Sequence, residues 1–595
     1  MCGICGELRF DNLRPERDTI AGMMARLERR GPDAAGQYAH GPVALGHRRL
    51  SIIDLSERSN QPLVDGELGL VLVFNGTIYN YPELRERLSS RGYHFFTGGD
   101  SEVILKAYAE WGEDCPQHLH GMFAFAVWDT RRQSLFMARD RFGIKPLYYS
   151  LTRQYLRFAS TSQALRAAGG LDTDIDPVAL HHHLTLHAVV PAPRTLLRGL
   201  RKLPPAHSMM IHADGSNTVK PYWQLRPVVP ASGMSEWEWI EALHEALIRS
   251  VERRRTIADV PVGILLSGGL DSSLLVALLA EAGAGDLHTF SVGFEDQPEE
   301  RGHEFEFSDM VADLYATKHQ RFSIPNREVL ARLPEAVDNM AEPMVGQDAV
   351  AFYLLGERVS KAVKVVQSGQ GADEVFAGYF WYPRMHAASG SDIERFRDFY
   401  FDRPHAELLE NIDPRHHGPD YTSPRVAHGL AQSGADRFLN RVLAFDVTTL
   451  IVDDPVKRVD NMTMAWGLEA RVPFLDHELV ELALGVPPEI KLRSGGKHIL
   501  KSIARGLLPD MVIDRPKGYF PVPALKFVRG EVLDFMRGIL ESGACRQRGL
   551  LNRNMVQKLL ASPDQHHTPI LGSKLWHLAL LEFWLQRNVD TIPPS

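Results

Sequence analysis

Short apolar runs bounded by Gly, Asp and Asn fill the first third of this chain, a pattern typical of strands in stacked sheets. The runs lie at residues 43–45, 68–74, 122–128 and 134–138. Between them, residues 82–91 and 101–111 repeat apolar side chains at helical spacing. Together these elements predict a layered α+β domain.

The pattern changes towards residue 235, where strand-like and helix-like segments begin to alternate. The strand-like runs are 260–266, 288–294, 319–324 and 363–367, and the helix-like ones are 236–253, 274–281, 304–315 and 349–361. Such alternation predicts an α/β domain with a parallel sheet and crossover helices.

A stretch punctuated by Pro and Gly, residues 196–223, separates these two patterns, and 227–235 then lacks an apolar period. We interpret the two segments as connection and linker. A boundary near 225–235 follows, which predicts one domain over 2–225 and a second over 235–590.

Composition narrows the function classes. The chain has 595 residues, 44% of them hydrophobic, enough for several ordinary cores. The net charge of -8 and a pI near 6.3 argue against a nucleic-acid partner and suit small-molecule chemistry. No apolar run is long enough for a bilayer, and the start lacks the layout of a secretory signal. We therefore expect a cytoplasmic protein with no membrane partner; its oligomeric state, including a homodimer, stays open.

Residue 2 is a cysteine, and this position carries the first candidate chemistry. Removal of Met1 would leave Cys2 with a thiol and a free α-amino group. An α-amine titrates near about 7.7–8.0 and suits a general base at neutral pH, beside a thiol of pKa about 8.5. The Cys2–Cys5 spacing also permits a redox pair or half a zinc site. No second cysteine pair completes such a site, so we interpret Cys5 as a small buried residue.

Several fragments behind Cys2 form an ordered set. They are Arg30-Gly31-Pro32-Asp33, His47-Arg48-Arg49-Leu50-Ser51-Ile52, Asn75-Gly76-Thr77-Ile78-Tyr79-Asn80 and Gly98-Gly99-Asp100-Ser101-Glu102. With Cys2-Gly3-Ile4 they resemble the class II glutamine amidotransferase domain, an N-terminal-nucleophile hydrolase with an αββα sandwich. The alternative for Asn75-Gly76 alone is a plain hairpin turn.

This resemblance implies a role for each residue. Cys2 attacks the side-chain amide of glutamine, and Asn75 with the Gly76 backbone N–H receives the oxyanion. Arg49 binds the α-carboxylate of glutamine, and Asp100 binds its α-ammonium. Many asparagine synthetases have glutamate where this chain has Thr77, so glutamine affinity is expected to differ here.

A second candidate site begins where the apolar run 260–266 leads into Ser267-Gly268-Gly269-Leu270-Asp271-Ser272-Ser273 and a helix. Strand, glycine-rich turn and helix favour an anion site, because backbone N–H groups and the helix dipole face the ligand. The sequence resembles the pyrophosphatase loop that splits ATP into AMP and pyrophosphate. The run 363–367 ends in a similar loop, Ser368-Gly369-Gln370-Gly371-Ala372-Asp373-Glu374. Asp271 and Asp373 are therefore the expected Mg²⁺ ligands.

With 469–476, 496–501 and 515–518, these loops resemble the asparagine synthetase family. The resemblance implies that ATP activates an acceptor carboxylate as an acyl-AMP, which ammonia from the first site attacks after an internal passage. It further implies that Leu265, Val292, Ser368 and Gly369 line the adenosine site and that Lys517 stabilises charge on the intermediate. The loop residues Ser267, Gly268, Gly269 and Ser272 complete the expected ATP site.

The acceptor is where the chain departs from asparagine synthetases. Gln370 stands where they commonly have a glutamate proposed as a base, which leaves Glu342, Glu374 or no base. Gln347 and Asp348 stand in a segment where some carry an arginine for the aspartate α-carboxylate. Aspartate would meet an acid where a cation is wanted. The segments 1–10, 187–194 and 300–305 resemble a bacterial subgroup, the N-acetylglutaminylglutamine amidotransferases, which implies a dipeptide acceptor for an osmolyte.

Three rival functions stay open. An asparagine synthetase would amidate aspartate. A tRNA-modifying enzyme would need a basic groove that this composition does not support. A glutamine or nucleotide sensor without catalysis would have lost Cys2 or the first loop, and both are present.

Overall fold

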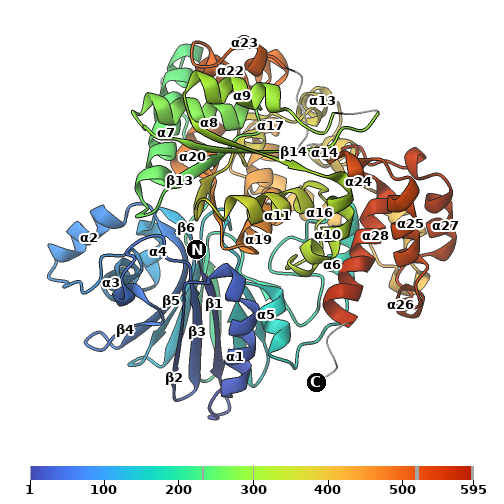
Figure 1. Cartoon of the computed structure of the whole chain (residues 1–595). Coiled ribbons are helices and arrows are strands. Elements are labelled where there is room, and N and C mark those ends of the chain that lie inside the picture. Colours follow the sequence, from blue (N-terminus) through green and yellow to red (C-terminus); the bar gives the residue numbers. More distant parts are fainter. Residues whose placement is uncertain (1, 231–232, 299–300, 516–521, 591–595) are drawn as a thin grey trace.

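The computed structural model describes residues 2–230, 233–298, 301–515 and 522–590. Figure 1 shows two regions: stacked sheets coloured blue to cyan, and a larger region coloured green to red that covers one end of them. The N-terminus lies where the two regions meet.

Two six-stranded antiparallel sheets form the first region. The first sheet has the order β10 (Arg201–Lys202), β8 (Tyr148–Leu151), β9 (Tyr155–Ala159), β1 (Gly3–Arg9), β3 (Val43–Arg49) and β2 (Ala34–His40). The second has the order β12 (Asn217–Pro221), β11 (His207–His212), β7 (Ser134–Arg139), β6 (Gly121–Asp129), β5 (Leu70–Ile78) and β4 (Leu63–Asp65).

Apolar side chains from both sheets fill the space between them, among them Ile4, Leu45, Val73 and Met137. Helices α1 (Arg17–Arg26) and α5 (Ser162–Ala167) pack on the first sheet, and α3 (Ser101–Trp111) packs on the second. Further helices of this region are α2 (Tyr81–Ser89), α4 (Cys115–His118) and α6 (Pro177–Thr185). Because both faces of each sheet are covered, helices and sheets form the predicted αββα sandwich.

Five parallel strands form the sheet of the second region, in the order β15 (Lys318–Ile324), β14 (His288–Phe294), β13 (Val262–Leu265), β16 (Val365–Gln367) and β17 (Glu469–Arg471). Figure 1 shows α7 (Glu236–Thr256), α8 (Leu270–Glu281) and α9 (Phe305–Leu314) on one side of the sheet. On the other side lie α11 (Asp348–Val359) and α19 (Pro455–Met464). The predicted α/β domain with crossover helices is confirmed.

The rest of the second region is helical. Its helices are α10 (Asn326–Asp338), α12 (Ala372–Phe376), α13 (Trp381–Ala387), α14 (Asp392–Tyr400), α15 (His405–Asn411), α16 (Thr422–Ala431), α17 (Phe438–Phe445), α18 (Ile451–Asp453), α20 (His477–Gly485), α21 (Pro488–Lys491), α22 (His498–Ala504), α23 (Asp510–Ile513), α24 (Pro523–Lys526), α25 (Gly530–Leu540), α26 (Gly543–Arg548), α27 (Arg553–Ala561) and α28 (Lys574–Leu585).

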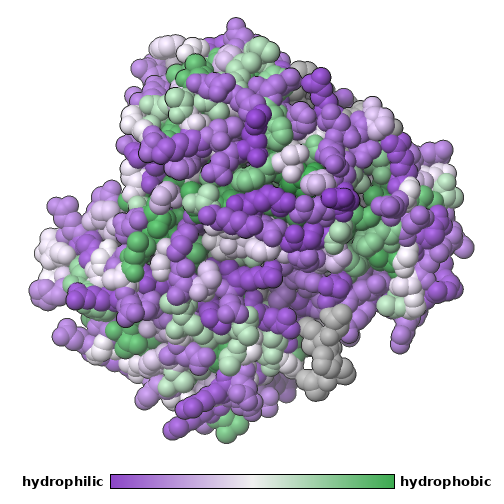
Figure 2. Space-filling model, viewed as in Figure 1, coloured by the Kyte–Doolittle hydropathy of each residue, from purple (hydrophilic) through white to green (hydrophobic). Residues whose placement is uncertain are grey.

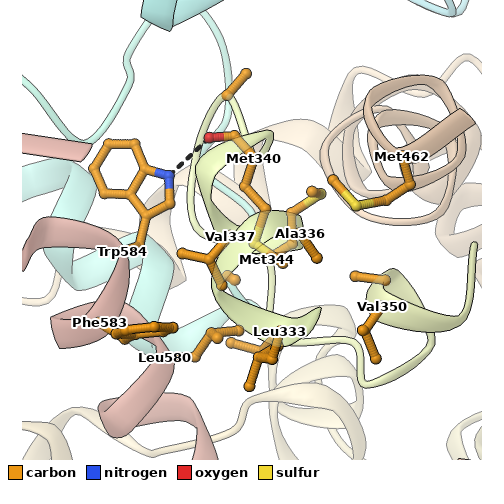
Figure 3. Close-up of a cluster of buried hydrophobic side chains, with 14 of the residues drawn as sticks. Leu333, Ala336, Val337, Met340, Met344, Val350, Met462, Leu580, Phe583 and Trp584 are labelled. Atoms are coloured by element: carbon orange, nitrogen blue, oxygen red, sulfur yellow. Dashed lines mark hydrogen bonds between the residues drawn. The ribbon is translucent and has the colours of Figure 1, made fainter. Parts of the chain in front are cut away.

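The last of these helices is held by a buried apolar cluster. Figure 3 shows Leu580, Phe583 and Trp584 of α28 beside Leu333 and Val337 of α10. The indole nitrogen of Trp584 also donates to the carbonyl oxygen of Met340 at 2.8 Å, so its one polar atom is satisfied. These contacts hold α28 against α10 and the segment that follows it.

The segment 196–223 differs from its prediction as a connection. It contains β10, β11 and β12, and β10 and β12 are the edge strands of the two sheets. Its strands have only two to six residues, and the Pro and Gly residues between them gave the segment the pattern of a loop. Other predicted elements agree closely, since α3 and β14 have the expected bounds. The domain boundary at 225–235 stays a prediction.

The surface is mostly polar. Figure 2 shows hydrophilic residues over most of the visible face, with hydrophobic side chains in separate patches. In the described part of the chain, no helix combines the length and apolar character needed to cross a membrane.

Candidate active sites

Three strands bring the first set of predicted residues together. Cys2 directly precedes β1, Arg49 ends β3, and Asn75 lies within β5 of the other sheet. The backbone nitrogen of Cys2 donates to Asn75 Oδ1 at 3.0 Å, which joins the two sheets at this point. After removal of Met1 that nitrogen would be the α-amine, already held in place by Asn75.

Asn75 keeps an unused donor. Its side chain is fully buried, and its Nδ2 has no hydrogen-bond partner among the residues that the structure describes. A buried donor without a partner costs about 1–3 kcal/mol, so this one is suited to a ligand oxygen. The hairpin alternative for Asn75-Gly76 is wrong, because both residues pair with β6 inside β5. At Gly76 a Cβ would lie 2.1 Å from the carbonyl oxygen of Met122, so a larger residue does not fit.

The Cys2 thiol is shielded from solvent, with 8% of the residue exposed. Burial raises its pKa, against the opposing effects of the amino terminus, a backbone hydrogen bond from Leu50 and the charge of Arg49. The resting thiol is therefore protonated near neutrality and needs a base before it can attack. Cys5 is fully buried and unpaired, as predicted.

Arg49 places a positive charge in this site. It forms no ion pair with any residue that the structure describes. Its Nη1 donates to the carbonyl oxygen of Ser56 and to Asn60 Oδ1, each at 2.8 Å. Both acceptors are neutral, so the guanidinium charge is not balanced. An arginine in this state attracts a carboxylate ligand.

Asp100 supplies the opposite charge. The residue is 7% exposed, and its Oδ2 accepts a hydrogen bond from the backbone nitrogen of Ile78 at 3.0 Å. Burial raises the pKa of this carboxyl to about 6, so it is ionised at neutral pH. Arg49 and Asp100 together offer a cation and an anion, the complement of an amino-acid zwitterion.

A carboxylate that the sequence did not assign enters this site from the second region. Glu469 lies in β17, and its Oε1 accepts from Thr77 Oγ1 at 3.2 Å and from Arg471 Nε at 2.6 Å. Burial opposes its ionisation, but the amino terminus and Arg471 lower the pKa of Glu469 to about 2. Thr77 thus has a carboxylate beside it. The two residues are 392 positions apart, so no local motif could have indicated the contact.

A cavity of about 1250 Å³ lies at the carboxyl ends of β13, β14 and β16. All but one of the residues predicted to bind nucleotide line it: Leu265, Ser267, Gly269, Asp271, Ser272, Val292, Ser368 and Gly369. The exception is Gly268, where the backbone has a positive φ of 77° and a Cβ would lie 2.7 Å from the nitrogen of Ser308. Gly268 therefore shapes the turn and does not form the cavity wall.

Lys497 occupies the predicted metal position. Its Nζ lies 2.7 and 2.6 Å from the two carboxylate oxygens of Asp271 and 2.8 Å from Asp373 Oδ1. The two carboxylates thus converge on one cation, an arrangement that suits a divalent metal with oxygen ligands. Lys497 lies in the segment 496–501 that carries the family resemblance, but the sequence indicated no role for it. Lys517, the predicted catalytic lysine, lies outside the described residues.

The cavity wall around Asp348, the expected acceptor segment, contains a cation that the sequence did not reveal. Arg458 of α19 lines the cavity, with its Nε 3.0 Å from Asp348 Oδ1 and its Nη1 against Asp454. Asp348 and Arg458 come from different helices, so the segment around Asp348 gave no sign of it. Two carboxylates balance the one guanidinium.

The two candidate bases differ in position. Glu374 lines the cavity with Gln370, and its Oε1 accepts from the hydroxyl of Tyr379 at 2.8 Å. Glu342 is absent from the cavity wall, and its Oε2 accepts from Lys202 Nζ at 2.8 Å. Because it lies behind the wall in an ion pair, Glu342 is a poor candidate for a base, which favours Glu374 among the two.

Two protein families match the chain in succession. The glutamine amidotransferase domain matches residues 1–223, and asparagine synthase matches residues 242–586. The asparagine synthetase [glutamine-hydrolyzing] 1 of Bacillus subtilis is 32% identical over 99% of this chain and 97% of its own length. The putative asparagine synthetase [glutamine-hydrolyzing] of Mycobacterium tuberculosis is 33% identical over 98% of this chain and 97% of its own.

A solved structure of glutamine phosphoribosylpyrophosphate amidotransferase from B. subtilis aligns with 54% of this chain and 90% of its own. Its TM-score of 0.30 and identity of 15% are too low to bear on the argument. The family match over more than half of the chain and the full-length relatives decide the assignment. The chain belongs to the asparagine synthase family of glutamine-dependent, ATP-dependent carbon–nitrogen ligases.

Proposed function

We propose that this chain transfers the amide nitrogen of glutamine to the carboxylate of an acceptor in two half-reactions. At the first site the Cys2 thiol attacks the glutamine side-chain amide, ammonia leaves, and water releases glutamate from the thioester. At the second site the acceptor carboxylate attacks ATP, and pyrophosphate leaves. Ammonia then displaces AMP from the acyl-AMP, which gives the carboxamide.

The first half-reaction is supported by the groups around Cys2. The mature α-amine, held by Asn75 Oδ1, takes the thiol proton. The unpartnered Nδ2 of Asn75, together with the predicted Gly76 N–H donor, meets the oxyanion. Arg49 and Asp100 bind the two charged groups of glutamine and fix its amide near the thiol.

The second half-reaction is supported by the two loops at the carboxyl ends of β13 and β16. Their glycines allow backbone N–H groups to approach the ATP phosphates. Asp271 and Asp373 would hold Mg²⁺, which supplies positive charge to the phosphates when bound. Lys517 is proposed to stabilise the developing charge, and Leu265 and Val292 to contact the adenosine.

Ammonia would travel between the sites inside the protein. Bulk water would protonate ammonia and hydrolyse the acyl-AMP, so a shielded passage protects both reactants. The contact of Glu469 with Thr77 ties β17 of the second region to the glutamine site, which favours a route along this interface.

One observation supports the acceptor class: Arg458, a cation of the acceptor wall, is balanced by Asp348 and Asp454. Aspartate brings two carboxylates, one to react and one that needs an unbalanced cation. An acceptor with a single carboxylate and neutral amides avoids this conflict. N-acetylglutaminylglutamine has this chemistry, and we propose it as the acceptor, with an osmolyte amide as the product.

The second candidate is an asparagine synthetase that amidates aspartate. The relatives in Bacillus and Mycobacterium carry that name. The presence of Arg458 in the cavity wall also favours it, if aspartate draws the guanidinium away from Asp348.

An acceptor panel separates the two. Purified enzyme with ATP, Mg²⁺ and glutamine is given aspartate, N-acetylglutaminylglutamine or buffer, and glutamate, AMP and pyrophosphate are measured together. We expect equimolar AMP, pyrophosphate and carboxamide only with the dipeptide. If aspartate is the one acceptor that supports turnover, the proposed acceptor is wrong. If glutamate is released but no AMP forms with any acceptor of the panel, the proposed ligase reaction is contradicted for these acceptors.

A further inference from the structure

Two histidines and an aspartate from distant segments meet beside the cavity. His187 follows α6, Asp402 follows α14, and His577 lies in α28. His187 Nδ1 is hydrogen-bonded to Asp402 Oδ1 at 3.4 Å, and His577 Nδ1 lies 3.1 Å from Asp402 Oδ2. The two imidazole rings are 4.9 Å apart at an interplanar angle of 74°. One carboxylate therefore contacts two rings through the same ring atom.

The cavity reaches both histidines. His187 and His577 line the cavity wall, whereas Asp402 is fully buried and does not. Since Asp402 lies against the Nδ1 edges, the Nε2 edges are the ones that a ligand can reach. When an imidazole is neutral and carries its proton on the Nδ1 atom that faces Asp402, its Nε2 is an acceptor. At Gly572 a Cβ would lie 2.8 Å from His577 Nε2, so glycine keeps the space in front of this atom open.

The backbone around Asp402 joins the segments that carry the histidines. The Asp402 nitrogen donates to the carbonyl oxygen of Thr185 at 2.9 Å. Arg403, fully buried, donates to the carbonyl oxygens of Leu184 at 3.3 Å and Lys574 at 2.9 Å. His187 itself has a positive φ of 52°, which non-glycine residues adopt only where their surroundings hold them. The three side chains are thus fixed relative to one another.

Charge decides what this wall can bind. Asp348 and Asp454 already balance Arg458, and Asp402 adds a further carboxylate behind the rings. A ligand carboxylate would meet hydrogen-bond acceptors and negative charge. A neutral group that donates N–H bonds fits both, and the primary carboxamide of a glutaminyl side chain is such a group.

We infer that His187 and His577, positioned by Asp402, accept hydrogen bonds from the side-chain carboxamides of the acceptor. The inference rests on the proposed function, because it concerns the part of the acceptor that does not react. It assigns the preference for a glutaminyl dipeptide over aspartate to this subsite, while the reacting carboxylate lies toward the nucleotide loops.

The test uses the full-length enzyme with two acceptors: N-acetylglutaminylglutamine and N-acetylalanylalanine, which keeps the backbone but lacks both carboxamides. For His187→Gln and His577→Gln we expect the KM of the glutaminyl acceptor to rise about 10-fold to 100-fold. The KM of the alanyl acceptor, the KM of ATP and the release of glutamate from glutamine should change less than about twofold. His212→Gln, at the exposed end of β11, is the matched control and should match wild type.

Two further variants separate a loss of acceptor binding from a loss of folding. Gly572→Ala adds a methyl group in front of His577 Nε2 without removing a polar group, and it should raise the same KM severalfold. Asp402→Asn should act in the same direction, because it changes which ring atom carries the proton. Variants whose thermal unfolding matches wild type but whose KM for the glutaminyl acceptor is unchanged would overturn the inference.

Other outcomes also decide against it. An equal KM rise for both acceptors would make the three residues structural. One equivalent of zinc in the purified enzyme would make them metal ligands, since these three ligand atoms lie within 4.8 Å of one another. If wild type amidates only aspartate, the proposed acceptor fails and this subsite with it. If wild type uses the dipeptide and the histidine variants use it equally well, this inference alone fails.

Discussion

The proposed glutamine site and the proposed acceptor wall each contain a buried arginine, but only one of the two is paired with protein carboxylates. Among the described residues, Arg49 donates only to neutral oxygens, so its charge is available to a ligand carboxylate. Arg458 is balanced by Asp348 and Asp454 before any ligand arrives. The difference teaches that an arginine in a pocket indicates a carboxylate ligand only where no protein carboxylate has already paired with it.

The nucleotide side of the cavity resembles the acceptor wall in this respect. Lys497 lies between Asp271 and Asp373, so these carboxylates are not free for a metal until the ammonium moves. The proposed glutamine site therefore suits its ligand as it stands, whereas the proposed Mg²⁺ could bind Asp271 and Asp373 only after Lys497 moved. Four changes test this contrast.

The largest effect is expected for Cys2→Ala. Removal of the nucleophile should lower glutamine-dependent carboxamide synthesis by about 1000-fold or more, because no other group can form the thioester. With ammonium as the nitrogen source, synthesis should stay within about twofold of wild type, since the second site is unchanged. The measurement is carboxamide formation with each nitrogen source at saturating ATP.

The counterpart is Asp271→Asn, which changes the second site only. It should abolish synthesis from both nitrogen sources and leave glutamate release from glutamine measurable. Loss of ammonium-dependent synthesis in Cys2→Ala, or its retention in Asp271→Asn, would contradict the separation into two sites.

Much of the fold and of the two candidate sites could be predicted from the sequence, because the patterns that indicate them are local. Each of these patterns is a continuous stretch of sequence, so its local geometry follows from neighbouring residues. This holds for the strand–loop–helix segment around Asp271 and for the fragments around Cys2, Arg49 and Asn75. The structure places Cys2 and Asn75 in contact, and it confirms the stacked sheets and the parallel sheet. Short strands such as β10 and β17 were missed because two or three residues carry no period.

The contacts that could not be predicted are those between distant segments. Glu469 with Thr77 and Arg458 with Asp348 each join two elements of different sequence position. The subsite of His187, Asp402 and His577 likewise depends on α6, α14 and α28 meeting. Charge balance in a pocket is a property of the fold, so the acceptor preference cannot be derived from one motif.

A third prediction concerns the unbalanced charge of Arg49. Arg49→Leu should raise the KM for glutamine about 100-fold, as expected for loss of a charge-assisted bond of about 2–3 kcal/mol. Arg48→Leu is the matched control, since its Nε donates to the carbonyl oxygen of Met24 and it lies on the neighbouring position of β3. Glutamate release is measured against glutamine concentration. A fall in kcat at unchanged KM would show that Arg49 does not bind glutamine.

The smallest expected effect is a pH dependence that originates at Asp100. Burial raises the pKa of this carboxyl to about 6, and only the ionised form attracts the α-ammonium of glutamine. Protonation below that pH removes the attraction, so the KM for glutamine should rise about 10-fold between pH 7 and pH 5. Asp100→Asn should have a high KM that is flat over this range, because its side chain does not titrate. If the variant kept the wild-type slope, another group would be responsible, and the cation–anion pairing proposed for the glutamine site would lose its anion.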